Sequence, residues 1–407
     1  MGLALRSKLL HGSRTMDSIE LFTGAGGLAL GTHVAGFHHL SLYEWDEDAC
    51  ETLRENARAE ALEGIRDWRV HQADVRLNSY AIFGQGVLDL VAGGAPCQPF
   101  SLGGKHRAQD DSRNMIPEFV RAVRELQPRA FILENVKGLT RQSFRNYFEY
   151  IRLQLTYPTV TKKREEDWTS HLHRLEEVST RGRHKGLQYN VIAELLNAAD
   201  YGVPQVRERV FIVGFRADTG LEWHFPEPTH SLDALVWEQH ISGAYWKRHG
   251  VRAPASKPVR LGLKLSELQE RDEPFPTKPW KTVRDAIEGL PEPRVDRESS
   301  KFSNHKLNPG AKAYPGHTGS PLDLPAKTLK AGVHGVPGGE NMVALPDGRL
   351  RYFTVREAAR LQTFPDSWHF EGAWSEAMRQ LGNAVPVELA AVVARSVAAK
   401  LRAADGH

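Results

Sequence analysis

The first 215 residues alternate short apolar runs with amphipathic stretches, and this alternation constrains the fold more than any other feature of the chain. Apolar runs predict strands near residues 18–22, 40–43, 87–92, 129–133 and 210–215, and the stretches between them predict helices, including 28–34, 116–126 and 191–198. Strands that alternate with helices are typical of βαβ units. We therefore predict an α/β fold with a doubly wound parallel sheet, in which ligands bind at the carboxyl ends of the strands.

The texture of the sequence changes after residue 215. Residues 216–349 are rich in Pro, Gly, His and Trp, and helical patterns return from residue 351. We predict a catalytic and cofactor-binding domain over residues 17–215 plus 350–407, interrupted by a smaller, irregular domain over residues 216–349. Residues 1–16 are expected to form a disordered leader, and the basic, polar segment 157–187 to form a surface insertion or a mobile connection.

The sequence has two cysteines, Cys50 and Cys97, in 407 residues. So few cysteines exclude a disulfide framework and a four-cysteine zinc site, and we expect no metal and a reducing, cytoplasmic location. No apolar run approaches the roughly 18 residues that a membrane span needs. The formal net charge of +3 permits a nucleic-acid partner without requiring one, because the charge that binds nucleic acid is usually local.

A glycine-rich turn follows the first predicted strand and reads Phe22-Thr23-Gly24-Ala25-Gly26-Gly27. Glycines there let the backbone pass close to a ligand at a helix N-terminus. The second predicted strand ends in Glu44-Trp45, which offers a carboxylate for ribose hydroxyls and an indole for stacking on adenine, and the third apolar region ends at Asp74. Each of the three also has a structural interpretation, as a surface acid, a core tryptophan and a helix N-cap. At successive strand ends, they predict a pocket for an adenosine-containing cofactor.

Cys97 lies between Pro96 and Pro99, which restrict the backbone on either side of the thiol. An isolated cysteine is more often a small core residue than a nucleophile, and Cys50, within a helical pattern, is interpreted in that way. Two further strand ends carry charge. Glu134 follows an apolar strand, where burial would raise the pKa of its carboxyl and make it a proton donor. Arg207 and Arg209 precede the last strand and, two residues apart, would share one face of it. In an arbitrary protein, such a pattern is more often a solvated run of charges beside a strand.

In this order, these segments resemble the DNA (cytosine-5)-methyltransferases over nearly the whole chain, without permutation. The resemblance rests on Phe22-x-Gly24-x-Gly26-Gly27, Glu44-Trp45, Asp74, Gly94-x-Pro96-Cys97-Gln98-x-x-Ser101, Glu134-Asn135-Val136, Gln205-x-Arg207-x-Arg209, residues 351–365 and Gly382-Asn383-Ala384-Val385-Pro386. The sequence departs from the family at Glu20, where an aspartate is common, and at Val206, where many relatives have a basic residue. The resemblance implies a Rossmann-like fold that uses S-adenosylmethionine, with residues 216–349 as a target-recognition domain.

The resemblance also implies roles for single residues. The Cys97 thiolate would add to carbon 6 of a flipped cytosine, Glu134 would hold or protonate ring nitrogen 3, and Arg209 would contact the base oxygen, with Arg207 organising the site or the DNA backbone. Cofactor contacts are implied for Phe22, Gly24, Gly26, Gly27, Leu28, Glu44, Trp45, Asp74, Val75, Pro96, Asn383 and Ala384. DNA contacts are implied for Gln98, Ser101, Lys105, Arg107, Gln205, Lys327, Thr328, Leu329 and Lys330, and the loop 100–113 would close behind the flipped base.

The expected partner is double-stranded DNA, and the expected protein is a monomeric modification enzyme that works alongside a restriction endonuclease without a stable complex. Two alternatives share the fold. A tRNA cytosine-5 methyltransferase resembles this chain in the core but carries a Cys-Phe-Thr signature in its variable region, which a chain with only Cys50 and Cys97 lacks. A catalytically silent DNA-binding protein would be marked by loss of the thiol or the carboxylate, whereas Cys97 and Glu134 are both present.

Overall fold

The computed structural model describes residues 14–96, 114–182, 184–254, 262–270, 275–312, 318–331 and 341–406. Its main feature is a seven-stranded sheet with the strand order β3-β2-β1-β4-β5-β7-β6. The strands are β1 (Met16–Leu21), β2 (Phe37–Glu44), β3 (Val70–Gln72), β4 (Leu90–Gly93), β5 (Ala130–Val136), β6 (Tyr189–Asn197) and β7 (Glu208–Arg216). The first five pair in parallel, as predicted.

The last two strands correct the sequence-based prediction in two ways. β7 runs antiparallel to both of its neighbours, β5 and β6, so the sheet is not wholly parallel. The short connection 198–207 suits an antiparallel pair, because a parallel pair needs a longer crossover. Residues 191–198, predicted to be helical, lie almost entirely in β6, which pairs with β7 along its whole length. A short apolar run such as this does not distinguish a strand from a helix by its periodicity.

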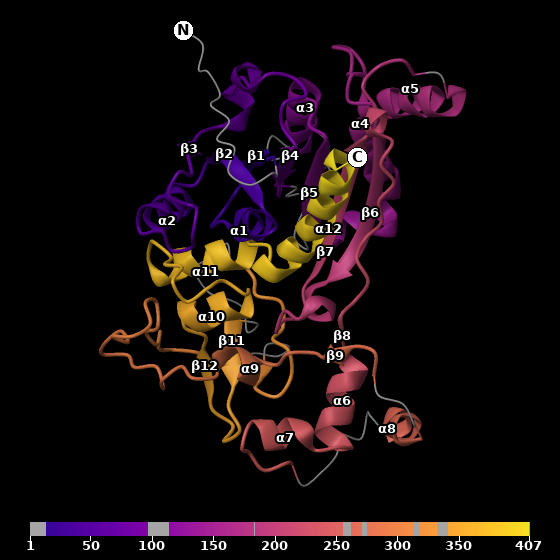
Figure 1. Ribbon diagram of the computed structural model, residues 1–407. Helices are drawn as coiled ribbons and strands as arrows, with labels where there is room; N and C mark the ends of the chain where they lie inside the picture. The colour runs from indigo at the N-terminus through magenta and orange to yellow at the C-terminus, as the bar shows by residue number, and fades with distance from the viewer. Residues whose placement is uncertain are drawn as a thin grey trace.

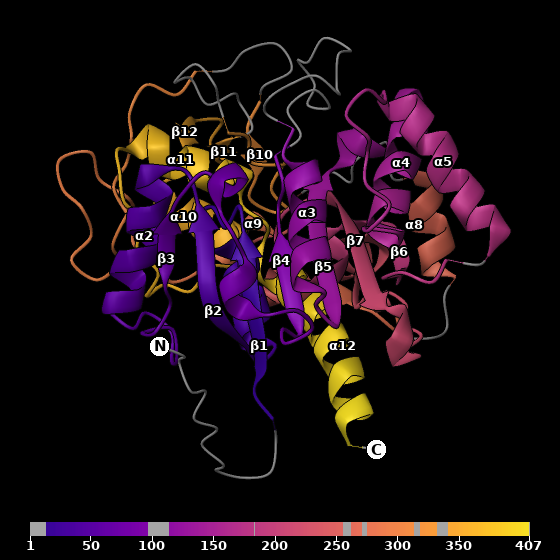
Figure 2. The same cartoon turned by 90° about the horizontal axis from the view of Figure 1, so that it is seen from above.

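Helices cover both faces of the sheet (Figures 1 and 2). On one face, α1 (Gly27–Val34) and α12 (Val387–Asp405) pack against the sheet, and on the other face α3 (Ile116–Leu126) and α4 (Arg145–Thr156) do so. Side chains of β1 alternate between the two cores: Ile19 and Leu21 join the α3 side, and Met16 joins the α12 side. The last helix of the chain therefore packs beside the first.

A third apolar core joins the two ends of the chain to its middle. It is formed by α1, α2 (Glu47–Arg58), α10 (Val355–Leu361) and α11 (Trp374–Asn383), and it also includes Val283, Ala326, Leu329 and Val343 from the expected second domain. β12 (Leu350–Tyr352) pairs with β11 (Met342–Ala344) across the expected boundary at residue 349/350. The two regions share this core, and the division into domains stays a prediction.

The rest of the middle region lies below the sheet in Figure 1. It contains α6 (Leu232–His240), α7 (Ala244–Arg248), α8 (Gly262–Gln269), α9 (Val283–Ile287), β8 (His230–Ser231), β9 (Lys278–Pro279) and β10 (Ser320–Pro321). Two small apolar clusters, one around Leu235 and one around Val236, stabilise it. Short elements and small cores agree with the irregular character predicted from the sequence.

Two segments outside the main sheet were also the subject of predictions. The end of the disordered leader was expected at residue 16, which is too late in the chain. Met16 is buried as the first residue of β1, and Arg14 forms ion pairs with Asp89 and Asp405. The segment 157–187 contains α5 (Trp168–Arg181), where the His171 ring is bonded to the hydroxyl of Tyr150 on α4 at 2.9 Å. Within the described ranges, no helix is long and apolar enough to span a membrane.

Candidate active site

Predicted site residues among those that the structure describes meet at one edge of the sheet. β1 to β5 are parallel, so their carboxyl ends lie along the same edge. Because β7 is antiparallel to β5, its amino end reaches this edge, where Val136 pairs with Arg209. The antiparallel direction of β7, which the sequence did not predict, is therefore what brings the arginines of Gln205-x-Arg207-x-Arg209 beside Glu134.

Glu134 and Arg209 form an ion pair that is almost closed to water. Arg209 Nε lies 2.9 Å from Glu134 Oε1, and the two residues are 9% and 6% exposed. Burial raises the pKa of the Glu134 carboxyl above its ordinary value, although the guanidinium of Arg209 opposes the shift. A carboxyl of this kind retains its proton to higher pH and can donate it to a base nitrogen.

The chain that leads to Cys97 is anchored beside this pair. Asn135 Nδ2 donates to the carbonyl of Ala95 at 3.0 Å, and a Cβ added to Gly94 would lie 3.2 Å from Glu134 Oε2. The carbonyl of Pro96 accepts a hydrogen bond at 3.1 Å from the amide of Met115, just before α3. Cys97 follows Pro96 directly but, like Gln98, Ser101, Lys105 and Arg107, lies outside the described residues, as does the expected loop 100–113.

The glycine-rich turn lies at the carboxyl end of β1. Phe22, Gly24 and Gly26 have φ values of 57°, 55° and 94°, so the turn uses the left-handed region that favours glycine. The amide of Gly24 donates to Glu44 Oε2 at 2.7 Å, and Glu44 Oε1 accepts from the amides of Trp45 and Asp46 at 2.8 Å each. Glu44 thus fixes the turn, and with roughly four lone-pair sites on a carboxylate it keeps capacity for one further donor.

The first turn of α1 packs against the segment between α11 and α12. A Cβ added to Gly27 would lie 2.1 Å from the carbonyl oxygen of Val385, so the contact requires glycine. Leu28 and Ala384 are buried here, whereas Asn383, the last residue of α11, is exposed. The structure therefore brings the predicted cofactor residues from both ends of the chain together.

Asp74 and Val75 follow β3 at the same edge. Asp74 accepts from the amide of Arg76 at 3.0 Å as the N-cap of a 3₁₀ turn over residues 75–77, which is the structural interpretation that the sequence allowed. It also forms an ion pair with the Arg76 guanidinium, which lowers the pKa of Asp74. The Val75 side chain is buried.

Comparison with known proteins decides between the classes that this geometry allows. The family model described as C-5 cytosine-specific DNA methylase matches residues 16–157 and 182–399. The chain belongs to this family. The methylase therefore transfers methyl groups to carbon 5 of cytosine in DNA, with S-adenosylmethionine as the donor. The match leaves out residues 158–181, which include α5.

Individual relatives cover nearly all of the chain. The Type II methyltransferase M.PspPI of Psychrobacter sp. (strain TA137) is 31% identical over 401 residues, 96% of this chain and 81% of the relative. The Type II methyltransferase M.NgoMIV of Neisseria gonorrhoeae is 30% identical over 395 residues, 95% of this chain and 98% of the relative. The solved structure of a triple mutant of Spodoptera frugiperda DNMT2 covers 92% of this chain and 97% of its own, with a TM-score of 0.55 and 16% identity, and shows the shared fold alone.

The residues at the glycine turn fit S-adenosylmethionine. A Cβ added to Gly24 would meet no atom within 4 Å, so the turn has an open face that a ligand can approach. The Trp45 side chain is 67% exposed beside this turn, which is unusual for so large an apolar group and leaves the indole available for stacking. Glu44 supplies a carboxylate next to both. When bound, S-adenosylmethionine would supply the methyl group to be transferred.

Arg207 and Gln205 point into the methylase and bond to backbone groups of segments that are distant along the chain. Arg207 is fully buried and donates to the carbonyls of Leu329, Gly382 and Ala384 at 2.9, 2.6 and 2.8 Å. Gln205, expected to contact DNA, is also fully buried: it accepts from the amide of Leu329 and donates to the carbonyl of Leu361. That expectation is not supported, because a side chain bonded to two backbone groups inside the fold is closed to DNA.

The predicted DNA-contacting segment 327–330 runs beside the segment 204–207. The amide of Val206 donates to the carbonyl of Ala326 at 2.9 Å, and the Thr328 hydroxyl donates to the carbonyl of Val206 at 2.8 Å. Leu329 is buried, so it anchors the segment and cannot contact DNA, whereas Lys330 is exposed. Lys327 is half-buried, and its Nζ donates to the hydroxyl of Thr318 at 3.1 Å.

Sequence reasoning missed two ionisable residues near this edge, the buried Glu20 and the half-buried Arg121. Both carboxylate oxygens of Glu20 on β1 are buried without a hydrogen-bond partner among the described residues, and burial raises the pKa of Glu20 well above its ordinary value. The departure from the more common aspartate was the only signal for Glu20. Arg121 on α3 had no signal, because a basic residue in an amphipathic helix is ordinarily a surface residue.

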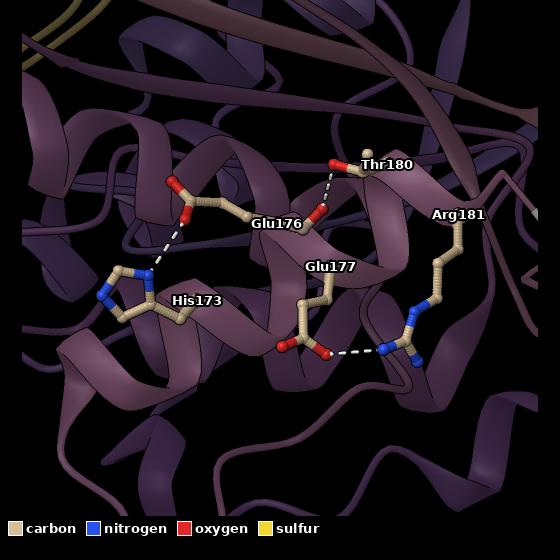
Figure 3. Close-up of a pocket in the computed structure, with 5 residues that line it drawn as sticks. All are labelled: His173, Glu176, Glu177, Thr180 and Arg181. Atoms are coloured by element: carbon tan, nitrogen blue, oxygen red, sulfur yellow. Dashed lines mark hydrogen bonds and ion pairs between the residues drawn. The ribbon is translucent and has the colours of Figure 1, made fainter.

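Other candidate features of the methylase carry no chemistry. Cys50 is buried, and burial raises the pKa of its thiol to about 12, in agreement with a structural role. No cluster of metal-ligating side chains occurs in the described part of the chain. A shallow depression on α5 is lined by His173, Glu176, Glu177, Thr180 and Arg181 (Figure 3). Its side chains pair with one another along the helix, which is typical of a solvated surface.

Proposed function

We propose that this methylase acts on a cytosine flipped out of double-stranded DNA, through a covalent bond between Cys97 and the base. The observation that supports the proposal best is the buried Glu134–Arg209 pair, which borders the chain that leads into Cys97. A carboxyl that retains its proton and a guanidinium can together bind one edge of a cytosine ring. The base must leave the duplex to reach them, which costs a few kcal/mol of stacking and pairing.

The proposed reaction divides one difficult substitution into three steps. The Cys97 thiolate bonds to carbon 6, and the electron pair of the 5,6 double bond makes carbon 5 nucleophilic. Glu134 holds or donates a proton at nitrogen 3, which offsets the negative charge on the ring, and Arg209 contacts the base oxygen. Carbon 5 then gains the methyl group. Loss of the carbon 5 proton restores the double bond and releases the thiolate.

We also infer which part of the chain recognises the DNA sequence. Residues 216–349 would form the target-recognition domain, with Lys327, Thr328 and Lys330 near the DNA. Lysine contacts to phosphate position a protein without selecting a sequence, so specificity needs further side chains that reach base edges. The bonds from Arg207 and Gln205 to Leu329 support this inference, because they attach the segment directly to the catalytic strands.

The relatives suggest a biological setting. The two relatives from Psychrobacter sp. and Neisseria gonorrhoeae are Type II methyltransferases. We infer that this protein is the modification enzyme of a restriction-modification system, acting as a monomer in the cytoplasm and partnered in function with an endonuclease. Expression of the chain should then protect plasmid DNA at one short sequence.

One assay tests the proposed function. Purified protein is incubated with plasmid DNA and S-adenosylmethionine carrying a labelled methyl group, and the DNA is digested to nucleosides for mass spectrometry. We expect label in 5-methylcytosine, and methylation-sensitive sequencing of the same plasmid should place it in one short duplex motif. Label on nitrogen 4, or label in RNA and not in any mixed-sequence DNA, would contradict the proposal.

A further inference from the structure

Arg121 on α3 connects this helix to the loop that follows β3. Its Nη2 donates to the carbonyl of Val75 at 2.7 Å, and its Nη1 donates to the carbonyl of Asn78 at 3.1 Å. Its Nε and Nη1 also bond to Glu118 and Glu125 on either side of it on α3, at 2.7 and 3.0 Å. The guanidinium is therefore held on its own helix by two carboxylates while it binds two carbonyls of the loop.

The side chains of Val75 and Tyr80 anchor the loop over residues 74–80 in the apolar core, but the loop has little regular backbone structure. It begins after β3, a three-residue edge strand that pairs only with β2 in the described sheet, and contains one 3₁₀ turn. Tyr80, at its end, is buried, and its hydroxyl has no hydrogen-bond partner among the described residues. The Arg121 guanidinium lies 5.1 Å from the centre of the Tyr80 ring. Arg121 thus contacts the loop at its start, its middle and its end.

α3 is also the helix that follows the segment carrying Cys97. The Met115 amide, one residue before α3, donates to the carbonyl of Pro96. One helix is therefore bonded at its amino end to the chain entering the nucleophile segment, and through Arg121 to the loop that carries Asp74 and Val75.

We propose that Arg121 is a positioning residue for S-adenosylmethionine. It fixes the loop 74–80 in the conformation that binds the cofactor and so sets cofactor affinity without touching the base. The proposal rests on the proposed function and on the cofactor contacts that the family resemblance implies for Asp74 and Val75. Removal of Arg121 should weaken cofactor binding and leave the rate at saturating cofactor almost unchanged, because the Glu134–Arg209 pair lies on other strands.

The test compares Arg121→Gln with Arg124→Gln on the same helix. Arg124 makes one long bond, 3.5 Å, to the carbonyl of Pro158 and does not contact the loop. Loss of two charge-assisted hydrogen bonds predicts about a tenfold or larger rise in the dissociation constant of S-adenosylmethionine for Arg121→Gln, measured by calorimetry on the whole protein without DNA. We expect KM for the cofactor to rise in parallel, kcat to stay within about twofold, and Arg124→Gln to match the wild type.

A second variant keeps the test decisive if Arg121→Gln unfolds. Arg121→Lys keeps the charge but has a single amine, so it should recover part of the affinity. Unchanged cofactor affinity in a folded Arg121 variant would overturn the proposal, and so would a fall in kcat with KM unchanged. Failure of the wild type to bind S-adenosylmethionine would instead contradict the proposed function, and so the two failures are distinguishable.

Discussion

At the scale of single residues, the chemistry of the site depends on burial. Glu134 has an arginine 2.9 Å away, which by itself would favour the charged carboxylate, and yet burial raises its pKa. The carboxyl therefore has a proton to donate over a wider pH range than an exposed glutamate. The Cys50 thiol, by contrast, donates to the backbone carbonyl of Glu44 at 3.6 Å, and burial raises its pKa to about 12, so it stays protonated and inert.

Glu134→Gln should lower the rate of methyl transfer by about a hundredfold to ten-thousandfold, the usual range for loss of a general acid. The protonated carboxyl of Glu134 is the active form. Wild-type activity should therefore be present below the raised pKa of Glu134 and fall as the pH rises through it. Single-turnover rates across a pH series measure both effects. Glu208→Gln is the matched control, because Glu208 is half-buried and pairs with the exposed Lys137.

The variant should lose this descending limb while binding S-adenosylmethionine as the wild type does. An identical pH profile in Glu134→Gln and wild type would contradict the role of Glu134 as proton donor.

The sequence predicts some of these residues better than others. Glu134 and Arg209 were identifiable because each lies at the end of an apolar strand. The burial of Gln205 was not, because its two partners, Leu329 and Leu361, lie more than a hundred residues away along the chain. A polar residue beside two arginines has the same local pattern whether it faces DNA or the protein interior.

At the scale of elements, the turn from β1 into α1 separates two uses of glycine. Gly24 has a positive φ and an open face, whereas Gly27 lies against the Val385 carbonyl. Here the sequence located the turn and the helix correctly, because glycine spacing and apolar periodicity are both local. The same reasoning failed at residues 191–198, where pairing with β7 decides the conformation and the local pattern does not.

Gly27→Ala and Gly24→Ala should therefore have different effects. The added methyl at Gly27 forces α1 away from Val385 and should lower the free energy of unfolding by about 2–3 kcal/mol. At Gly24 the strain of a left-handed alanine should cost about 1 kcal/mol, while the methyl enters the open face and weakens cofactor binding. Urea unfolding and calorimetric titration with S-adenosylmethionine measure the two quantities. The division would be contradicted if the two variants lost cofactor affinity and stability in the same proportion.

At the scale of the whole molecule, ion pairs join the two ends of the chain. Asp89, whose side chain has no exposed surface, contacts Arg14 and Arg129 at 3.1 and 2.9 Å, and Arg129 also contacts Asp405 near the end of α12 at 2.8 Å. The carboxylate of Asp89 also accepts from the amide of Asp17. This network lies at the opposite edge of the sheet from the site, so it affects stability without touching the chemistry.

Arg129→Gln should lower the free energy of unfolding by about 2–4 kcal/mol, because it removes the main partner of a buried carboxylate. Asp405→Asn should cost at most about 1 kcal/mol, since Asp405 is one-third exposed. Arg129 lowers the pKa of Asp405, so the contribution of this pair is present above the ordinary pKa of aspartate and is lost as the pH falls. Urea unfolding at pH 7 and at a pH below the ordinary aspartate pKa of about 3.9 measures both, and equal costs for the two variants would show that Asp89 does not depend on Arg129.

The covalent step is best tested with duplex DNA that carries 5-fluorocytosine in the target motif. Fluorine at carbon 5 cannot leave as a proton does, so the bond between Cys97 and carbon 6 should persist after methyl transfer. With S-adenosylmethionine present, the wild type should form a complex with DNA that survives denaturing electrophoresis, and Cys97→Ser should form none while still binding the cofactor. A Cys97→Ser protein that formed the complex as well as the wild type would contradict the role of Cys97 as nucleophile.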